Sequence, residues 1–536
     1  MNYWLINPKS DGSNTNLSDM KSDCIKMGWD EQVCPRFYYD VKANDIIIVA
    51  EGSHSNNRVH FIGIADKLNK EEHCWHLLYP TKDMNEDVEK IIRNNPSHFG
   101  GGESNNPWGP TRSIIQITNN NSAEEEIKAK LNTYFMKIKM KEQLKQYATL
   151  LSTNKNIILT GAPGTGKTYL AKEIAKALGA TGEACKLVQF HPSYDYTDFV
   201  EGLRPLSDNN GNIGFERKDG IFKAFCAKAL KYSFDKAYDK LTEDIRKGKV
   251  ETIELKTKSS SKLSVTDGKN IHWYSETEVN NISSNAVSRL RLKNLYKQYY
   301  TLEKLKTMSN IQSEVKDVIG GCDATYYWGV LHYLLEQYIK PFVFIIDEIN
   351  RGEISKIFGE LFYSIDPGYR GRKGKVNTQY QNLIPKEEDK DFNPNSTDAF
   401  RNGFYVPENV YIIGTMNDID RSVESMDFAF RRRFAFMEIK ADENTGMLDS
   451  LKWKDEAIER MKRLNTEIEK IEGLSSAYHI GASYFLKLEN YNGDFGKLWE
   501  YHLKGLLFEY LRGMQSVDKK LEQLKAAYEN ESNPNN

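Results

Sequence analysis

The stretch GAPGTGKT carries the residue types that bind a phosphate chain, and it directly follows the apolar run NIILT. The pattern G-x-x-x-x-G-K-[ST] between a strand and a helix predicts a loop whose backbone N–H groups surround phosphate oxygens at a helix N-terminus. Its lysine reaches the β- and γ-phosphates, and the threonine after it binds magnesium. The expected nucleotide-binding residues are Gly161, Ala162, Pro163, Gly164, Thr165, Gly166, Lys167 and Thr168.

Two acids, Asp347 and Glu348, follow the apolar run FVFII. The carboxyl ends of parallel strands are where α/β sheets bind their ligands. We expect Asp347 to hold magnesium through water, together with Thr168, and Glu348 to polarise the water that attacks the γ-phosphate. The alternative is that the two acids only cap the next helix, and the phosphate loop in the same chain favours the catalytic interpretation.

A further apolar run, NVYIIGT, leads to Asn417 and then to the basic cluster AFRRRF. At the end of a strand beside the one that carries Asp347, the amide of Asn417 can hydrogen-bond both a water and a γ-phosphate. A γ-phosphate transition state gains from a cation that a neighbouring subunit supplies, and Arg432 and Arg433 are the candidates. A solvated helix end is the alternative for these arginines.

The motifs lie in a region, residues 153–440, where strand-like runs alternate with helix-like segments. This alternation predicts an α/β domain with a parallel sheet, whose central strands are apolar throughout. A charged insert near 235–325 interrupts the domain, and residues 441–536 are expected to form a helical subdomain with a polar tail. The basic stretch YRGRKGKV at 369–376 either contacts DNA or is a solvated hairpin tip.

Residues 1–118 have a different texture, with short strand-like runs separated by Gly and Asn. The runs DIIIVAEG, VHFIGIADKL and RSIIQIT predict a small β-rich module, and we expect a barrel. Residues 119–152, which open with NNNSAEEE, are expected to form a helical linker, because a serine N-cap precedes three glutamates.

Composition sets limits on what the chain does. Its 536 residues suffice for two to four domains, and a net charge of −2 gives no global field for nucleic acid. No secretory signal and no run of 18 apolar residues is present, so no membrane partner is expected. Six scattered cysteines without a C-x-x-C pair predict a reduced, cytoplasmic protein without disulfides or a zinc site.

Four segments together resemble the McrB-like AAA+ GTPases, the motor subunits of modification-dependent restriction systems. They are GAPGTGKT, VQFHPSYDYTDFVEGLRP, FIIDEINRGEISKIFGELF and GTMNDIDRSVESMDFAFRRRFAF, and the resemblance spans roughly residues 150–490. It implies a homo-hexameric ring that hydrolyses GTP with Mg²⁺ and a separate McrC-like nuclease subunit. No guanine motif Asn-Lys-x-Asp is present, and the nearest match, NKEE at 69–72, lies in another domain, so ATP stays open.

The resemblance also implies roles for single residues. In the motif Met-Asn-x-x-Asp, Asn417 and Asp420 position the attacking water, while a turn acid is the alternative for Asp420. An arginine of AFRRRF reaches the adjacent subunit, and Arg351 lies near that interface. One departure is Ala482 in IGASYF, where the family carries histidine, and this puts a lid contact by that residue in doubt.

The N-terminal runs YWLI, IKMGWDE, NDIIIVAEG and FIGIADK resemble the EVE and YTH branch of the PUA-like fold. These small barrels read modified bases, which are flipped into a pocket and stacked on aromatic side chains. Trp29 is the first candidate for nucleic-acid binding, and Trp4, Trp75 and Trp108 are secondary ones. The alternative for each tryptophan is a place in the barrel core.

The sequence as a whole predicts a motor that recognises modified DNA and powers cleavage by another subunit. No nuclease centre is expected in the chain itself, because the short Glu-x-Lys matches in ETIELKTK and FMEIK are frequent by chance and neither has a convincing upstream aspartate. Two alternatives remain, namely an ATP-driven remodelling chaperone of the MoxR-like kind and an RNA-binding regulator with an NTPase switch.

Overall fold

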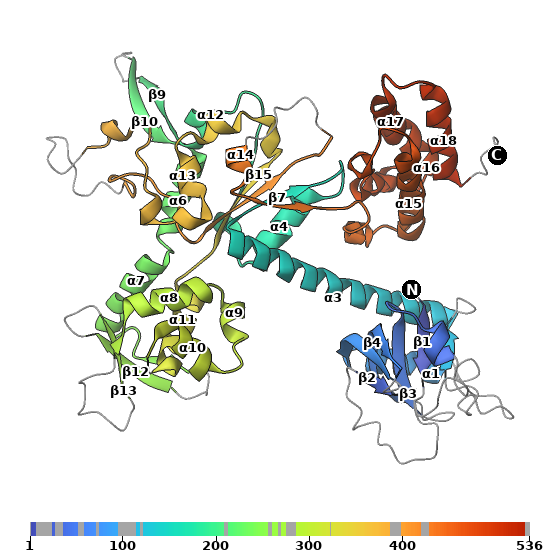
Figure 1. The fold of residues 1–536 in the computed structure, drawn as a ribbon, viewed down its shortest axis with the longest axis horizontal. Helices are drawn as coiled ribbons and strands as arrows, with labels where there is room; N and C mark the ends of the chain where they lie inside the picture. Colours follow the sequence, from blue (N-terminus) through green and yellow to red (C-terminus); the bar gives the residue numbers. More distant parts are fainter. Residues whose placement is uncertain are drawn as a thin grey trace. The chain divides into compact units, whose positions relative to one another are not determined.

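The computed structural model divides the chain into two units, Met1–Gln143 and Leu144–Asn536, which are described separately (Figure 1). Among the described residues, no helix is both long and apolar enough to cross a lipid bilayer. The structure describes residues 2–6, 24–26, 36–51, 58–70, 74–94, 114–117, 122–207, 213–255, 260–265, 270–274, 286–321, 323–385, 398–419 and 428–530.

The described strands of the first unit form a six-stranded sheet in the order β2-β5-β4-β3-β1-β6. Strands predicted from DIIIVAEG, VHFIGIADKL and RSIIQIT are present as β3, β4 and β6. No pairing among the described strands joins β2 to β6, so the closed barrel stays a prediction. The elements are β1 (Tyr3–Ile6), β2 (Cys24–Lys26), β3 (Ile46–Glu51), β4 (Arg58–Asn69), β5 (Cys74–Thr81), α1 (Asn85–Asn94) and β6 (Ile114–Ile117).

Two of the candidate tryptophans belong to the core of this unit. Trp4 and Trp75 are 2% and 5% exposed, and both pack in one apolar cluster. The indole N–H of Trp4 donates to Asp45 at 2.9 Å, and that of Trp75 donates to the Phe37 carbonyl at 2.7 Å. Both rings therefore fill the sheet's core with satisfied polar atoms, as the alternative interpretation held.

The expectation of cysteines without disulfides is wrong at one position. Cys74, the first residue of β5, is disulfide-bonded, whereas Cys185 and Cys226 in the second unit are free. Scattered spacing along the chain did not reveal this bond, because a disulfide depends on the separation of two Cα atoms across the fold.

A 33-residue helix, α3 (Ser122–Asn154), forms where the helical linker is expected. Its first turns contribute Ile127, Leu131 and Phe135 to the apolar cluster of the first unit. Its last turns contribute Ala148 and Leu151 to a cluster of the second unit.

The second unit is built on a parallel sheet in the order β17-β7-β16-β15-β8, which confirms the predicted α/β domain. Side chains alternate between its faces, so that Ile158 and Phe344 join one apolar cluster while Ile157 and Val343 join the other. The strands are β7 (Asn156–Thr160), β8 (Cys185–Gln189), β15 (Phe342–Asp347), β16 (Val410–Thr415) and β17 (Ala435–Glu438).

Helices cover both faces of this sheet (Figure 1). Helix α4 packs with the end of α3 on one face, and the other face is covered by α5, α6, α12, α13 and α14. These helices are α4 (Lys167–Ala177), α5 (Tyr196–Phe199), α6 (Ile221–Leu230), α12 (Ile354–Phe358), α13 (Leu361–Ile365) and α14 (Phe428–Arg431).

The insert and the C-terminal region each have a core of their own. The insert's core reaches Ile339, beyond the expected end near 325, because α11 packs into it. Helices predominate after residue 441, as predicted. The insert contains α7 (Phe234–Arg246), β11 (Thr252–Glu254), β12 (Ser260–Val265), β13 (Ile271–Tyr274), β14 (Ala286–Val287), α8 (Arg289–Gln298), α9 (Leu302–Lys306), α10 (Ile311–Ile319) and α11 (Ala324–Gln337). The C-terminal helices are α15 (Lys454–Lys470), α16 (Phe495–Leu498), α17 (Lys504–Leu511) and α18 (Val517–Glu529).

The basic stretch at 369–376 is not a hairpin tip. It lies on two short 3-10 turns, Pro367–Tyr369 and Arg372–Gly374. Arg370 between them is 3% exposed, so this part of the stretch is buried rather than solvated. Composition alone did not reveal this burial.

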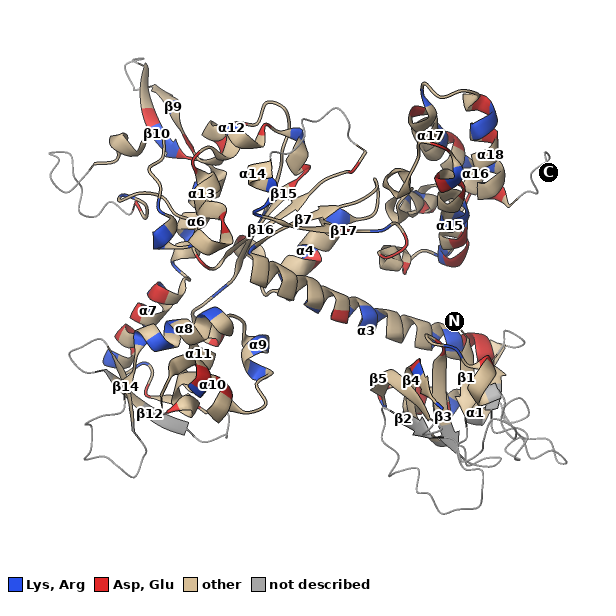
Figure 2. Cartoon of the chain, in the orientation of Figure 1, with Lys and Arg blue, Asp and Glu red and all other residues tan. Residues whose placement is uncertain are grey.

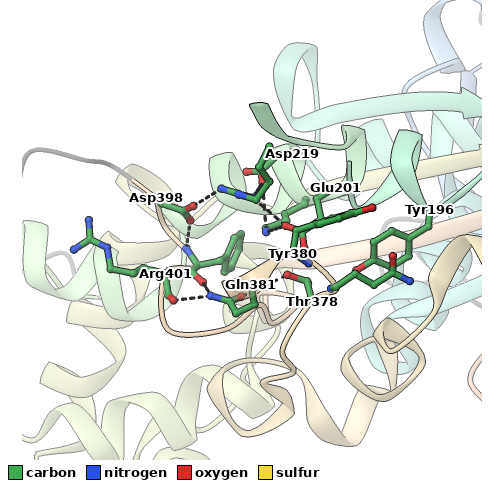
Figure 3. Close-up of polar contacts among 12 residues, drawn as sticks. Tyr196, Glu201, Asp219, Thr378, Tyr380, Gln381, Asp398 and Arg401 are labelled. Atoms are coloured by element: carbon green, nitrogen blue, oxygen red, sulfur yellow. Dashed lines mark hydrogen bonds and ion pairs between the residues drawn. The ribbon is translucent and has the colours of Figure 1, made fainter. Parts of the chain in front are cut away.

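A hairpin of β9 (Glu201–Ser207) and β10 (Ile213–Asp219) is held at its base by a buried polar network (Figure 3). The ammonium of Lys223 lies 2.5 Å from the carboxylate of Glu201, and both side chains are fully buried. Arg217 adds ion pairs to Glu201 at 2.9 Å and to Asp398 at 2.7 Å. Burial raises the pKa of Glu201, but Lys223 and the hydrogen bonds from Thr378 and the Tyr380 N–H together outweigh burial, so the pKa is lowered.

Replacing one member of this network tests its contribution to stability. Glu201→Ala leaves the buried ammonium of Lys223 without its main partner, so we expect a loss of about 3 kcal/mol in the free energy of unfolding by urea denaturation. The matched variant Glu216→Ala, at an exposed pair with Lys218, should change it by less than about 0.5 kcal/mol.

The effect of Glu201→Ala should also depend on pH. A carboxylate whose pKa is lowered by folding stabilises the protein above its unfolded value, 4.5, and loses that contribution as pH falls through the folded value. The difference between wild type and variant should therefore shrink below pH 4.5. A difference that grows as the pH falls would contradict this account.

Candidate active site

The predicted phosphate loop, Gly161–Gly166, joins the end of β7 to the start of α4. Gly164 and Gly166 have φ values of 77° and 79°, a left-handed conformation that favours glycine. A Cβ atom at Gly166 would also lie 2.2 Å from the methyl group of Met447. The backbone conformation therefore favours glycine here, and a larger residue would also displace the end of the Met447 side chain.

Lys167, the first residue of α4, is 7% exposed. Its ammonium donates to the carbonyls of Gly161 at 2.9 Å and Ala162 at 2.8 Å, and the hydroxyl of Thr165 donates to the same Ala162 carbonyl at 3.0 Å. The positive charge is thus held within the loop.

Asp347 joins three elements of the site. One of its carboxylate oxygens accepts hydrogen bonds from the hydroxyls of Thr168 and Thr415, each at 2.6 Å. The pairing of β15 with β16, Ile346 opposite Gly414, places Thr415 beside the acid. Hydroxyl and carboxylate oxygens suit Mg²⁺, which takes one or two protein carboxylates and keeps several waters. Among the described residues, no group of three or more His, Cys, Asp or Glu is placed to hold a metal ion.

Glu348 and Asn417 meet at the ends of the neighbouring strands β15 and β16. The amide of Asn417 donates to one oxygen of Glu348 at 2.8 Å, and Arg351 lies 3.4 Å from the other. Glu348 has φ 51°, an uncommon conformation for a residue other than glycine. Such backbone strain is concentrated at functional sites.

The arginines of AFRRRF differ in their surroundings. Arg433 has a side chain only 10% exposed, 3.8 Å from Asp366 and 5.8 Å from the centre of the Phe362 ring. Arg431 lies 4.6 Å from the centre of the Phe436 ring. Arg432 is exposed. The structure therefore separates two arginines that sequence reasoning could not rank.

The C-terminal subdomain contacts the phosphate loop through its backbone. The N–H groups of Gly481 and Ser483 donate to the carbonyls of Pro163 at 3.1 Å and Gly164 at 3.0 Å. Ala482 between them is fully buried in the subdomain's own core. The alanine that replaces the family's histidine thus leaves a contact by IGASYF in place, made by its neighbours.

Sequence reasoning missed three residues of this site. Thr415 bridges Asp347 and the N–H of Glu348, which donates to its hydroxyl at 3.2 Å. Asn444 donates to the Thr165 carbonyl at 3.0 Å. Burial raises the pKa of Asp418, while Lys167 acts in the opposite direction. Thr415 stands two residues before Asn417 in the sequence, but only the register between β15 and β16 places it beside Asp347.

Three residues named from the sequence, Asp420, Trp29 and the secondary candidate Trp108, lie outside the described residues. Their roles stay predictions. The structure brings together Lys167, Thr168 and Asp347 on one side of the site, and Glu348 and Asn417 on the other.

Comparison with known protein families identifies the class of this region. Residues 156–251 and 287–434 match the AAA domain of the dynein-related subfamily. The second unit therefore contains an AAA+ P-loop NTPase fold. Residues 456–518 match the McrB alpha-helical lid domain, so the C-terminal helices form a lid of the McrB type.

The relatives found by sequence are restriction proteins. The chain is 30% identical over 348 residues to the type IV methyl-directed restriction enzyme EcoKMcrB subunit of Escherichia coli (strain K12), which is 62% of this chain and 48% of that protein. It is 24% identical over 320 residues to the type II restriction enzyme BsuMI component YdiS of Bacillus subtilis (strain 168), which is 59% of this chain and 65% of that protein. The matches span about half of the first relative and under two thirds of the second.

These matches support the AAA+ P-loop NTPase fold and the McrB-type lid that the sequence predicts. Neither family model matches residues 1–118, so the EVE/PUA-like reader stays a prediction. Among solved structures, that of C. elegans PCH-2 covers 73% of this chain and 68% of its own at 12% identity, but its TM-score of 0.17 is too low to support an argument.

The hydroxyl of Thr415 offers a test of the site. Thr415→Val keeps the shape of the side chain but removes a hydrogen bond to Asp347, and the loss of such a partner typically lowers metal affinity or activity about 10–100-fold. We expect the Mg²⁺ concentration for half-maximal nucleotide hydrolysis to rise about 10-fold, with Mg²⁺-free nucleotide binding unchanged. The exposed Thr466→Val is the matched control. An unchanged Mg²⁺ dependence would contradict the assignment of Asp347 to the metal.

Proposed function

We propose that this chain is the nucleotide-hydrolysing motor of a modification-dependent restriction system, which acts with a separate McrC-like nuclease subunit. The observation that carries the proposal is the McrB-type lid, whose N–H groups at Gly481 and Ser483 bind the carbonyls of the phosphate loop. The two relatives, both restriction proteins, support the same function.

In the proposed reaction, water attacks the γ-phosphate in line with the leaving group. The phosphate loop and Lys167 bind the phosphate chain, and Glu348 accepts the proton of the water. Asn417 orients the water from the next strand, and its hydrogen bond at 2.8 Å fixes the carboxylate of Glu348. Asp420 is proposed as a second water-positioning group.

A magnesium ion held by Thr168 and Asp347 would neutralise the charge that develops on the phosphates. The oxygens of these two side chains already lie 2.6 Å apart, which fits a shared ion with oxygen ligands. GTP is the proposed nucleotide because of the resemblance to McrB-like GTPases, and parallel assays with ATP test this choice.

We further propose a homo-hexameric ring in which Arg432 enters the site of the adjacent subunit. Exposure of Arg432 and the contacts of Arg433 to Asp366 and Phe362 support this choice. Arg351 lies 3.4 Å from Glu348 of its own subunit and is proposed to orient that carboxylate.

Modified DNA is the proposed ligand of the first unit, read by Trp29. Support comes from the resemblance to EVE and YTH modules and from the packing of Trp4 and Trp75, which excludes both as exposed stacking platforms. A ring would present several such modules and raise affinity through avidity.

Mixing two inactive variants tests the ring and the arginine together. Lys167→Ala should abolish nucleotide binding, and Arg432→Ala should lower turnover by about 10³, since an arginine supplied in trans is worth 10³–10⁵. When the two are mixed, a Lys167→Ala subunit still supplies Arg432 to its neighbour's intact site. We expect the rate of GTP hydrolysis by the mixture to exceed the sum of the rates of the two variants measured separately.

Two controls make this result specific. Lys167→Ala mixed with Glu348→Gln should show no recovery, because both defects lie in the same site. A mixture of Lys167→Ala with Arg433→Ala should also show no recovery of hydrolysis, because Arg433 contacts its own subunit. Recovery with Arg433→Ala but not Arg432→Ala would overturn the choice of arginine, and tight nucleotide binding by Lys167→Ala would overturn the phosphate loop.

The reader assignment is tested by DNA binding. Trp29→Ala should remove the preference for duplexes with a modified cytosine over plain duplexes, because stacking is worth about 1–3 kcal/mol per base. The exposed Tyr501→Ala in the lid is the control and should leave the preference unchanged. An unaltered preference in Trp29→Ala would return Trp29 to the core, and preference for methylated RNA would favour a regulator instead.

A further inference from the structure

A cavity of about 1210 Å³ lies between the insert and the sheet of the second unit. Its walls come from α7 and α8, from the segment around Arg370, and from Lys155 and Glu408, which precede β7 and β16. The phosphate loop follows the other end of β7. A five-residue strand, roughly 16 Å long, therefore separates the cavity from the nucleotide site.

The cavity is strongly basic in a chain whose net charge is −2. Ten lysine and arginine residues line it against four aspartates and glutamates. Of the ten, only Lys240 and Lys293 form an ion pair with a carboxylate of the described residues. Figure 2 shows the blue Lys and Arg positions along the ribbon of α8, one wall of the cavity. Such a concentration of unpaired cations attracts an anion.

Arg370 is the buried cation of this cavity. It is 3% exposed, and one nitrogen of its guanidinium donates to the side chain of Asn156. The other two nitrogens, Nε and Nη1, have no hydrogen-bond partner among the described residues. An unpaired buried charge is costly, so a guanidinium kept here is suited to an acceptor that a ligand brings.

Lys155 is a second cation of the cavity lining and lies near Arg370. Its ammonium donates to the Glu408 carbonyl at 3.1 Å and lies 4.5 Å from the centre of the Tyr411 ring, but no carboxylate of the described residues pairs with it. Burial and the nearby guanidinium of Arg370 lower the pKa of Lys155 to about 7, and burial lowers the pKa of Arg370 to about 10. Two like charges close to each other, one buried and one partly exposed, favour a bound anion between them.

Aromatic rings complete the lining. Tyr300 and Tyr405 are partly exposed within it, and the ammonium of Lys304 lies 4.6 Å from the centre of the Tyr300 ring. Planar heterocycles stack on such rings. The volume exceeds the usual 300–1,000 Å³ of a small-molecule pocket, so a ligand with several phosphate groups or two rings fits.

We propose that this cavity binds a phosphorylated small molecule of nucleotide size, with its phosphate at Arg370 and Lys155 and its ring system against Tyr300 and Tyr405. The fork of an arginine matches phosphate oxygens, and its hydrogen bonds to them are charge-assisted. This second site is independent of the phosphate loop and goes beyond the proposed motor function.

The test uses the full chain carrying Lys167→Ala, so that the phosphate loop does not contribute. Inorganic pyrophosphate, adenosine 5′-monophosphate and adenosine are titrated into it by calorimetry. We expect the two phosphates to bind at one site per chain and adenosine to bind at least about tenfold more weakly. Adenosine binding as tightly as its monophosphate, or no saturable binding of either phosphate, would overturn the proposal.

Charge reversal at the cavity's exposed rim makes the test specific. Arg372→Glu combined with Lys373→Glu should weaken both phosphates at least about tenfold. The matched control is Arg512→Glu with Lys519→Glu, which makes the same change of charge on exposed residues of the lid and should alter affinity less than about twofold. Equal weakening by both pairs would reduce the effect to net charge and overturn the site.

Arg370→Gln keeps an amide donor for Asn156 while removing the charge. Pyrophosphate should raise the melting temperature of the parent protein but not of this variant, and an equal rise in both would exclude Arg370 from the site. If Arg370→Gln does not fold, the affinities of the variant with Arg372→Glu and Lys373→Glu decide whether the phosphates bind in this cavity. A single strand of about 20 nucleotides that binds where neither small phosphate does would identify a nucleic-acid surface and overturn the proposal.

Discussion

The geometry of the candidate active site depends on the hydrogen bonds that the carboxylate of Asp347 accepts. One of its oxygens accepts from Thr168 on α4 and from Thr415 on β16, each at 2.6 Å, while the residue itself ends β15. Because Thr415 also accepts from the N–H of Glu348, the acid beside Asp347 takes its position from the same hydroxyl. The parallel order β7-β16-β15 makes this possible, since it gathers the carboxyl ends of three strands at one edge.

The two edges of the parallel sheet differ in the partners of their charged side chains. At the carboxyl edge, Lys167 donates to the carbonyls of Gly161 and Ala162, and Glu348 lies 3.4 Å from Arg351. At the amino edge, the buried Arg370 and the partly exposed Lys155 lie near each other, and neither forms an ion pair with a described carboxylate. A fold tolerates the first arrangement unaided, whereas the second is costly unless an anion offsets it.

Where a residue's position follows from a local pattern, that position could be predicted from the sequence. The phosphate loop, Asp347 and Asn417 each follow an apolar run, and the end of a strand is fixed by the run itself. Thr415 was missed because its role depends on the register between β15 and β16. Arg370 and Cys74 were misjudged for a related reason, since burial and cross-strand distances are properties of the fold and not of composition.

A hydrogen-bonded route connects the basic cavity with the arginine segment proposed to act in trans. Asn156 accepts from Arg370, and its own amide donates to the carbonyl of Arg433 at 2.9 Å. Coupling between two sites needs an element with two arrangements. Strand β7 is a poor candidate, because it pairs on both sides and its residues 156–159 are buried. The end of α14 is better placed, since Arg432 beside Arg433 is exposed and a small shift there redirects its side chain. An anion at Arg370 would thus act on the ring interface through Asn156 rather than through the sheet.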